Sequence, residues 1–246
     1  MPIKYQAAVA LAKLLLNGGL GNTARDVLKP SLASMLEIYL QLMEEIDSEE
    51  LMMALEDVID SYSKYIEPYA VQLCQQLANR YKLLTVKPEA ADDANSSEEE
   101  ERNLAATACV TTINQIVVSC SKNKSCLRTI LPIIYPILVK SLTRDGEDII
   151  KDSLDAVNYI IYYGYDRESR VPAELWKLLP QMFYITAGKE DNLKAGLAID
   201  YLDLVTLITK NFINRDPQSL LSVGEGQTET YFALMMKFVK KILLVN

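Results

Sequence analysis

Apolar residues recur at steps of three and four along almost the whole chain of 246 residues. This spacing places them on one face of an α-helix, and no segment shows the sustained period-two alternation that is typical of a β-strand. Pro132, Pro136 and Pro180 fall inside periodic stretches, where proline kinks or breaks a helix. The pattern predicts an all-α protein, with helices within residues 2–16, 32–46, 51–62, 66–84, 105–120, 127–141, 150–161, 175–182, 197–212 and 231–245.

Short turns between these stretches predict antiparallel neighbours, because a short connection keeps consecutive helices side by side. The spacing of each pair is close to the about 40–47 residues of HEAT-type repeats, which stack into solenoids. We therefore expect residues 1–246 to form a single α-solenoid segment of about five HEAT-type helix pairs, with the helix that begins at Pro2 as half a repeat. The missing polar end repeats favour a fragment of a longer superhelix.

Two segments interrupt the helical pattern. Residues 87–101 contain Pro88 and no large apolar side chain, which predicts an acidic loop inserted between the two helices of one repeat. Residues 214–227 predict a longer connection between helices, with a short helical turn at Pro217–Leu221.

Acidic residues are concentrated in one part of the chain. Residues 37–101 carry 17 Asp and Glu against 4 Lys and Arg, a net charge of −13 in a chain whose overall net charge is −8. The helical part of this block, residues 37–60, has no compensating base. A field of one sign steers partners of the opposite sign, whereas a purely solubilising surface normally mixes both signs. The block therefore favours a surface for basic protein partners, with solvated surface as the alternative.

The candidate contacts fall into two groups. One lies in or beside the predicted loop, where the final glutamates have a second interpretation as favourable charges at a helix N-terminus. The other lies on the helix expected within residues 51–62. The candidates are Asp92, Asp93, Glu98, Glu99, Glu100 and Glu101 in the first group, and Glu56, Asp57 and Asp60 in the second.

Several classes of function lack their usual residues. The chain has no histidine, which is the commonest general base and metal ligand, and no C-x-x-C pair among Cys74, Cys109, Cys120 and Cys126. The cysteines are expected to be structural thiols, although Cys120 and Cys126 flank a turn and could be exposed. We expect no catalysis, metal or cofactor. Neither a signal segment nor a membrane-spanning stretch is visible. An acidic chain binds nucleic acid poorly, because the phosphate backbone is also negative.

Four segments carry a resemblance to a known family. Leu51–Leu77 reads LMMALEDVIDSYSKYIEPYAVQLCQQL and resembles a central repeat of the importin-beta superfamily of nuclear transport receptors. The match continues in order along nearly the whole chain, and its later parts resemble the importin seven and importin eight branch. The other three segments are Pro2–Leu16, Trp176–Phe183 and Asn214–Leu221.

The resemblance implies an interior part of a right-handed HEAT superhelix that wraps basic cargo. It also implies regulation by the GTPase Ran, contact with nucleoporins, and shuttling between cytoplasm and nucleus. The family's main Ran surface lies in N-terminal repeats outside this chain, and its acidic loops touch cargo or Ran. A HEAT scaffold or adaptor subunit of another multiprotein complex is the alternative, because it would share the fold and the composition.

Overall fold

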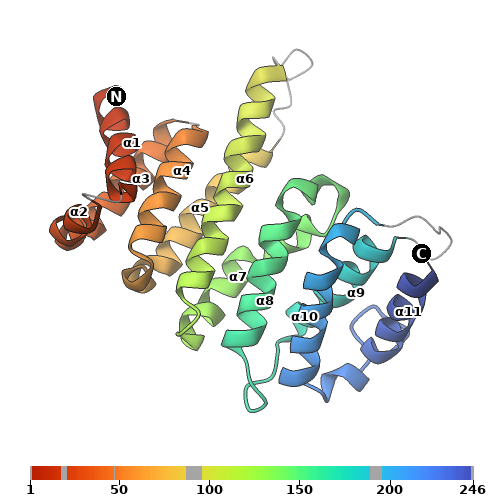
Figure 1. Cartoon of the computed structure of the whole chain (residues 1–246). Coiled ribbons are helices and arrows are strands. Elements are labelled where there is room, and N and C mark those ends of the chain that lie inside the picture. Colours follow the sequence, from red (N-terminus) through yellow and green to blue (C-terminus); the bar gives the residue numbers. More distant parts are fainter. Residues whose placement is uncertain (1, 18–20, 47, 87–95, 189–195, 245–246) are drawn as a thin grey trace. The chain divides into compact units, whose positions relative to one another are not determined.

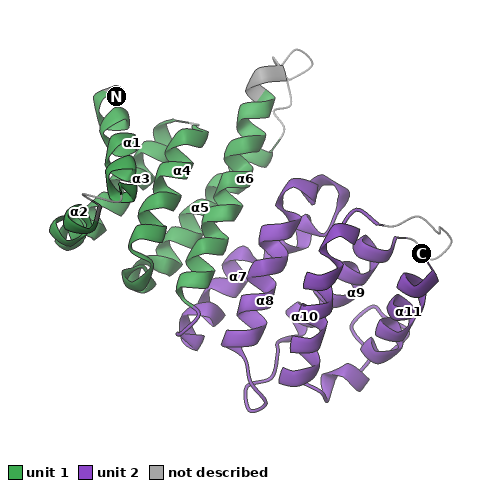
Figure 2. Ribbon diagram, viewed as in Figure 1, with its two compact units in different colours: residues 1–120 green, residues 121–246 purple. Residues whose placement is uncertain are grey.

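The computed structural model describes residues 2–17, 21–46, 48–86, 96–188 and 196–244, and the statements below concern these residues. Most of them are helical, and they contain no strand and one isolated bridge, between Val223 and Thr230 (Figure 1). The prediction of an all-α chain is confirmed. The chain divides into two compact units, Met1–Cys120 and Ser121–Asn246 (Figure 2).

The first unit stacks its helices in series. Helix α4 lies between α1 and α6, and the pairs α3–α4 and α5–α6 follow one another as in a HEAT-type solenoid. Helix α1 precedes the first complete pair, as half a repeat would. The bounds are α1 Pro2–Leu16, α2 Gly21–Leu28, α3 Leu32–Glu45, α4 Glu49–Ser61, α5 Ala70–Thr85 and α6 Ser96–Ser119.

The apolar spacing explains why α4 occupies the middle of this stack. Leu51, Leu55 and Val58 recur at steps of four and three, and all three are fully buried. The helix begins after Ser48, whose hydroxyl accepts a hydrogen bond from the Leu51 backbone N–H at 3.4 Å. Burying one face of α4 leaves its acidic residues on the opposite face.

The second unit repeats the arrangement. Helices α7 and α8 form one pair, α8 packs beside α10, and α9 contacts both α10 and α11. Aromatic rings fill the core between α9 and its neighbours. The centroid of the Trp176 ring lies 4.6 Å from that of Phe212 and 4.8 Å from that of Tyr231. The bounds are α7 Lys124–Ser141, α8 Ile150–Gly164, α9 Ala173–Ala187, α10 Leu202–Arg215 and α11 Tyr231–Leu244.

The two segments expected to be irregular differ from the predicted boundaries. Of residues 87–101, those from Ser96 onward form the start of α6, and residues 87–95 lie outside the described residues. Carboxylates in the first turns of a helix are stabilised by its macrodipole, which accounts for a helical start in so acidic a segment. At the other segment, α10 continues to Arg215 and the connection runs to Thr230, with one 3-10 turn at Ser219–Leu221.

Two further expectations bear on the helices and the thiols. The prolines do not break their helices: α7 includes Pro132 and Pro136, both on its exposed face, and α9 includes Pro180. On an exposed face, water can hydrogen-bond the carbonyls that proline leaves unpaired. Cys120 and Cys126, which flank a turn and could have been exposed, are buried, as are the other two cysteines.

Candidate functional site

The structure describes most but not all of the predicted binding residues. Asp92 and Asp93 lie outside the described residues, and Glu98 is described only as backbone of α6. Glu99, Glu100 and Glu101 follow it in the first turns of α6, where all three are exposed. The other group, Glu56, Asp57 and Asp60, lies on α4 opposite its buried face.

The carboxylates on α4 form a partly buried negative patch. Asp57 and Asp60 are one helical turn apart, and Asp60 accepts a hydrogen bond from the side-chain amide of Gln115 on α6 at 2.8 Å. Partial burial, followed by repulsion from Asp60, raises the pKa of the Asp57 carboxyl above its ordinary value. Burial and the neighbouring carboxylate both disfavour the ionised form of Asp57, so a cationic side chain bound here would stabilise that form.

The two predicted groups of carboxylates are not brought together. Asp60 lies level with Gln115, and Glu101 precedes Gln115 by 14 residues on α6. At a rise of 1.5 Å for each residue, Glu101 lies about 21 Å farther along the helix. The structure therefore presents two separate acidic patches on neighbouring helices. We call Glu56, Asp57 and Asp60 the α4 patch, and Glu99–Glu101 the α6 patch.

Glu50, in the helical part of the acidic block, is paired with a base from outside that block. Glu50 accepts hydrogen bonds from the Tyr5 hydroxyl at 2.8 Å and from the Lys13 ammonium group at 3.2 Å. These two donors lower the pKa of Glu50. Both belong to α1, so Glu50 joins α1 to α4, and no local pattern in the sequence could have shown the pairing.

A groove between α1 and α3 was not anticipated from the sequence. Its volume is about 310 Å³, and Ala7, Leu11 and Met35 contribute to an apolar lining. Lys4 and Glu45 also line it and bring one charge of each sign. An apolar segment matches the character of this lining.

Nothing among the described residues points to metal or thiol chemistry. No group of acidic, cysteine or histidine side chains there is placed to hold a metal ion. Burial raises the pKa of the Cys109 thiol to about 12, which disfavours the reactive thiolate. A search of the described helices found none with the length and apolar character needed to cross a bilayer.

Comparisons with known proteins agree with the resemblance of the sequence to importins. No family model matches the chain, and no solved structure matches it significantly. Curated relatives are named importins: an importin beta-like SAD2 homolog of Arabidopsis thaliana is 28% identical over 81% of this chain and 18% of its own length. A probable importin-7 homolog of Dictyostelium discoideum is 24% identical over 99% of the chain and 20% of its own length.

Importin-8 of Homo sapiens is 22% identical over 90% of the chain and 19% of its own length. The chain therefore spans about a fifth of the length of these relatives. Similarity that covers most of the chain confirms the resemblance that Leu51–Leu77 and the three other segments indicated.

Proposed function

We propose that this chain is a section of a nuclear transport receptor that binds basic protein cargo through the acidic patches of its first unit. The support is the similarity to proteins named importins, together with a stacked helical fold and a concentration of carboxylates. In this proposal the parent protein shuttles between cytoplasm and nucleus, contacts nucleoporins and is regulated by Ran. It acts by binding and carries out no catalysis.

The observation that carries the proposal is the α4 patch. Asp57 and Asp60 repel one another, and burial of Asp57 adds to the cost of its ionised form. A lysine or arginine of a cargo protein would remove that cost, so cargo binding should lower the pKa of Asp57. An individual exposed ion pair contributes only about 0–1 kcal/mol, so useful affinity needs several contacts at once.

The separation of the two patches indicates what the cargo segment looks like. An extended chain advances about 3.3 Å for each residue, so about six residues are needed to cover the about 21 Å between the patches. A segment with two basic clusters separated by that length could contact Asp60 and Glu101 together. Asp92, Asp93 and Glu98, which precede the α6 patch in the sequence, belong to the proposed surface as further acidic contacts.

The test is to neutralise each patch separately. The probe is a fluorescein-labelled peptide with two lysine clusters separated by a Gly-Ser spacer, and its binding is measured by fluorescence anisotropy. Combined Glu56→Gln, Asp57→Asn and Asp60→Asn should weaken binding about tenfold, because three ion pairs of about 0.5 kcal/mol are lost. The corresponding triple change at Glu99, Glu100 and Glu101 should weaken it similarly.

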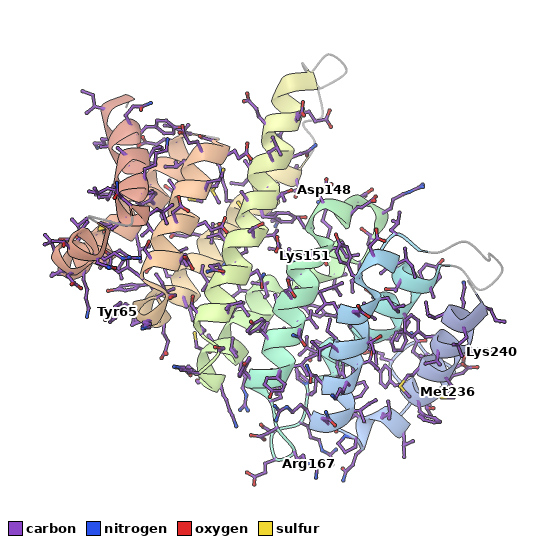
Figure 3. The ribbon with its side chains drawn as sticks, in the orientation of Figure 1. Tyr65, Asp148, Lys151, Arg167, Met236 and Lys240 are labelled. Carbon is purple, nitrogen blue, oxygen red and sulfur yellow. The ribbon has the colours of Figure 1, made fainter. Side chains whose placement is uncertain are left out.

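A matched control is available in the second unit. Asp145, Glu147 and Asp148 are exposed in the 3-10 turn before α8, outside the acidic block, and Asp148 is labelled in Figure 3. Neutralising these three removes the same charge from the whole chain and should leave the affinity within about twofold of the unchanged chain, because none of the three belongs to the α4 or α6 patch. If the control and the two patch variants lost the same amount of affinity for the peptide, only the net charge of the chain would matter.

The loop residues need their own variant. Neutralising Asp92, Asp93 and Glu98–Glu101 together should reduce binding of the lysine-cluster peptide and leave the helical circular dichroism spectrum unchanged. If this variant binds normally and the α4 variant does not, the α4 patch alone is the site. If none of the variants affects binding, the acidic block is solvated surface and the proposal fails.

A scaffold or adaptor subunit of another complex is the competing function. Sensitivity to Ran separates the two, because cargo binding by a transport receptor changes when Ran-GTP is added. A pull-down with the full-length parent protein, with and without Ran-GTP, measures this directly. For the present chain we expect weak or no Ran-GTP binding, since the resemblance assigns the main Ran surface to other repeats. Tight binding of Ran-GTP by residues 1–246 would contradict that expectation.

A further inference from the structure

Three tyrosines and one arginine form a continuous cluster on the second unit. The rings of Tyr159 and Tyr163 on α8 stack with centroids 5.6 Å apart, and Tyr163 meets Tyr162 edge-on at 4.7 Å. The guanidinium group of Arg215, in the last turn of α10, lies over the Tyr162 ring at 4.6 Å. We call these four residues the Tyr–Arg surface.

The surface is exposed although it is aromatic. Tyr162 is 45% exposed and Tyr163 is 40% exposed. The hydroxyl groups of Tyr159, Tyr162 and Tyr163 have no hydrogen-bond partner among the described residues. Single exposed apolar residues are normal on a soluble protein, but contiguous aromatic rings beside an arginine are the composition of binding hot spots.

Two arginines and one exposed carboxylate carry the charges around this surface that have no ion-pair partner among the described residues. Arg215 has no carboxylate within ion-pair distance among the described residues, and Arg167 is exposed in the turn directly after α8 (Figure 3). Of the carboxylates near the tyrosines, Asp155 pairs with Lys151 at 3.0 Å. Glu168, which follows Arg167 in the turn, adds one exposed negative charge.

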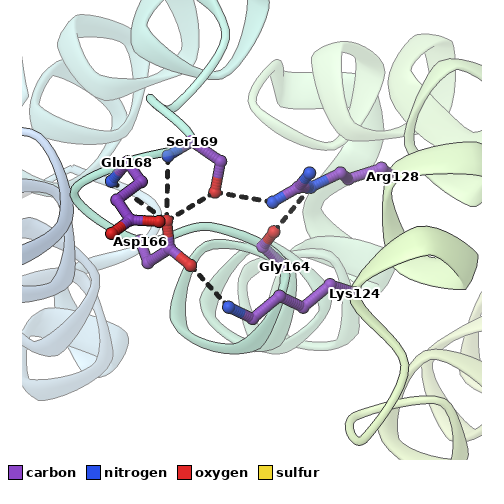
Figure 4. Close-up of polar contacts among 6 residues, drawn as sticks. All are labelled: Lys124, Arg128, Gly164, Asp166, Glu168 and Ser169. Carbon is purple, nitrogen blue, oxygen red and sulfur yellow. Dashed lines mark hydrogen bonds and ion pairs between the residues drawn. The ribbon is translucent and has the colours of Figure 1, made fainter.

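The turn at the end of α8 is held by a dense set of polar contacts, shown in Figure 4. One carboxylate oxygen of Asp166 accepts from the backbone N–H of Ser169 at 2.8 Å and from its hydroxyl at 2.7 Å, and the other pairs with Lys124. Arg128 donates to the carbonyl of Gly164 at 2.8 Å and to the Ser169 hydroxyl at 2.6 Å. The end of α8 is therefore fixed before a partner arrives, which reduces the entropy lost on binding.

We propose that the Tyr–Arg surface is a second protein-docking site, which takes an acidic peptide segment carrying aromatic or aliphatic side chains. The apolar side chains of that segment pack on the tyrosine rings, and its carboxylates pair with Arg215 and Arg167. Carboxylate pairs with arginine are strong because the guanidinium group presents two parallel donors. This partner is opposite in charge to the cargo proposed for the α4 and α6 patches, so the two sites select different proteins.

The experiment uses three fluorescein-labelled peptides and the full chain. In the first peptide, Asp and Glu alternate with Phe and Leu. In the second, Asn and Gln replace the acids, and in the third, Ser replaces Phe and Leu. Anisotropy should show clear binding of the first peptide and at least about tenfold weaker binding of the other two, because each retains only one of the two interactions.

Two variants and two matched controls assign the binding to this surface. Tyr162→Ala and Arg215→Gln should each weaken binding of the first peptide about tenfold, as loss of a hot-spot side chain does. The controls are Tyr184→Ala on α9, where the tyrosine is 52% exposed, and Lys240→Gln on the exposed side of α11. The affinity of both control variants for the first peptide should lie within about twofold of that of the unchanged chain, since these positions lie outside the cluster.

Several results would overturn the proposal. Equal affinity for the neutral aromatic peptide would remove the role of Arg215 and indicate a neutral apolar partner instead. Normal binding by both Tyr162→Ala and Arg215→Gln would place the peptide elsewhere. If Tyr162→Ala lowers the helical content, Arg215→Gln decides the question, because it removes a charge and keeps a residue that favours helix.

Discussion

Buried tyrosine hydroxyls connect helices of the first unit that are distant in the sequence. Tyr39 on α3 donates to the backbone carbonyl of Ala8 on α1 at 2.6 Å. Burial raises the pKa of Tyr39, and it raises the pKa of Tyr81 on α5 to about 12. The buried thiol of Cys109 on α6 behaves in the same way, with a pKa of about 12. All three groups are neutral in the folded chain near pH 7.

Because the pKa values of these three groups are raised, we expect the free energy of unfolding to fall at alkaline pH. Their pKa values in the folded chain lie above the ordinary values of 10.0 for Tyr and 9.0 for Cys, so their contribution to stability is complete only well below pH 9. It is lost as the pH rises towards about 12, because the unfolded chain releases these protons first. Urea unfolding should give a constant free energy near pH 7 and one that falls as the pH rises through about 9.

Tyr81→Phe provides the control for this pH dependence. The substitution removes one titrating group, so the free energy of unfolding should fall less steeply with pH than in the unchanged chain, whatever its value at pH 7. A free energy that rises between pH 9 and 11 would show that these groups are not buried as the structure has them.

Two glycines differ in whether the structure has room for a side chain at their position. A Cβ atom added at Gly146 would lie 2.4 Å from the backbone oxygen of Lys140 and 2.4 Å from the Cα of Ser141. At Gly164 the nearest atom would be the Leu127 Cβ at 3.6 Å, an ordinary contact. The turn after α7 therefore requires glycine, whereas the end of α8 does not.

The predicted outcome is opposite for the two alanine substitutions. Gly146→Ala should lower the free energy of unfolding by about 1–3 kcal/mol, because the backbone of α7 must move. Gly164→Ala should leave it unchanged or raise it by up to about 1 kcal/mol, because alanine favours helix. Urea unfolding followed by the fluorescence of Trp176, the single tryptophan, measures both. Similar losses in the two variants would contradict the packing at Gly146.

At the scale of elements, the connection between α10 and α11 depends on one buried carboxylate. Asp216 is 3% exposed and accepts hydrogen bonds from the Ser219 hydroxyl at 2.7 Å and the Trp176 indole N–H at 3.3 Å. It joins the end of α10 to the following 3-10 turn and to α9. The connection is therefore ordered by a side chain, although it contains little regular structure.

Removing this carboxylate should weaken the second unit. Asp216→Ala is expected to lower the free energy of unfolding by about 2 kcal/mol, the usual effect of losing hydrogen bonds to a charged group. Trp176 fluorescence should also shift, since its indole N–H loses its acceptor. Asp203→Ala, at an exposed position on α10, the helix that Asp216 follows, is the control and should have little effect. A loss of equal size at Asp203 would point to general destabilisation of α10.

At the scale of the whole molecule, charge is unevenly distributed along the chain. Residues 37–101 hold 17 of the 33 acidic residues and belong to the first unit. A concentrated field accelerates association with oppositely charged partners, and salt screens it. The chain should therefore bind basic partners at a rate that depends strongly on ionic strength.

Stopped-flow association with the lysine-cluster peptide tests this expectation. The rate constant should fall at least about tenfold as salt rises from about 0.05 to 0.5 M, because the Debye length shortens from over 10 Å to a few ångströms. The combined variant at Glu56, Asp57 and Asp60 should show a weaker dependence, and the control variant at Asp145, Glu147 and Asp148 an unchanged one. A rate constant independent of salt would exclude steering by the acidic block.

The sequence alone predicted most helices of this chain and the existence of its acidic block, but it did not predict α2. Leu51, Leu55 and Val58 repeat at helical spacing, and such a pattern predicts a helix and its buried face because both depend on neighbours in the chain. The number of carboxylates in residues 37–101 is likewise a property of composition. The predicted boundaries were less accurate: the loop expected to reach residue 101 gives way to helix at Ser96.

Only the tertiary structure decided which charges and rings meet. Glu50 is neutralised by Lys13, 37 residues away, and Asp60 contacts Gln115, 55 residues away. The same packing separates the α4 and α6 patches and places Arg215 over Tyr162. Helical periodicity predicts which face of a helix is buried, but it does not predict which other helix covers that face or in what register the two helices pack. Those contacts depend on how side chains from distant segments fit together.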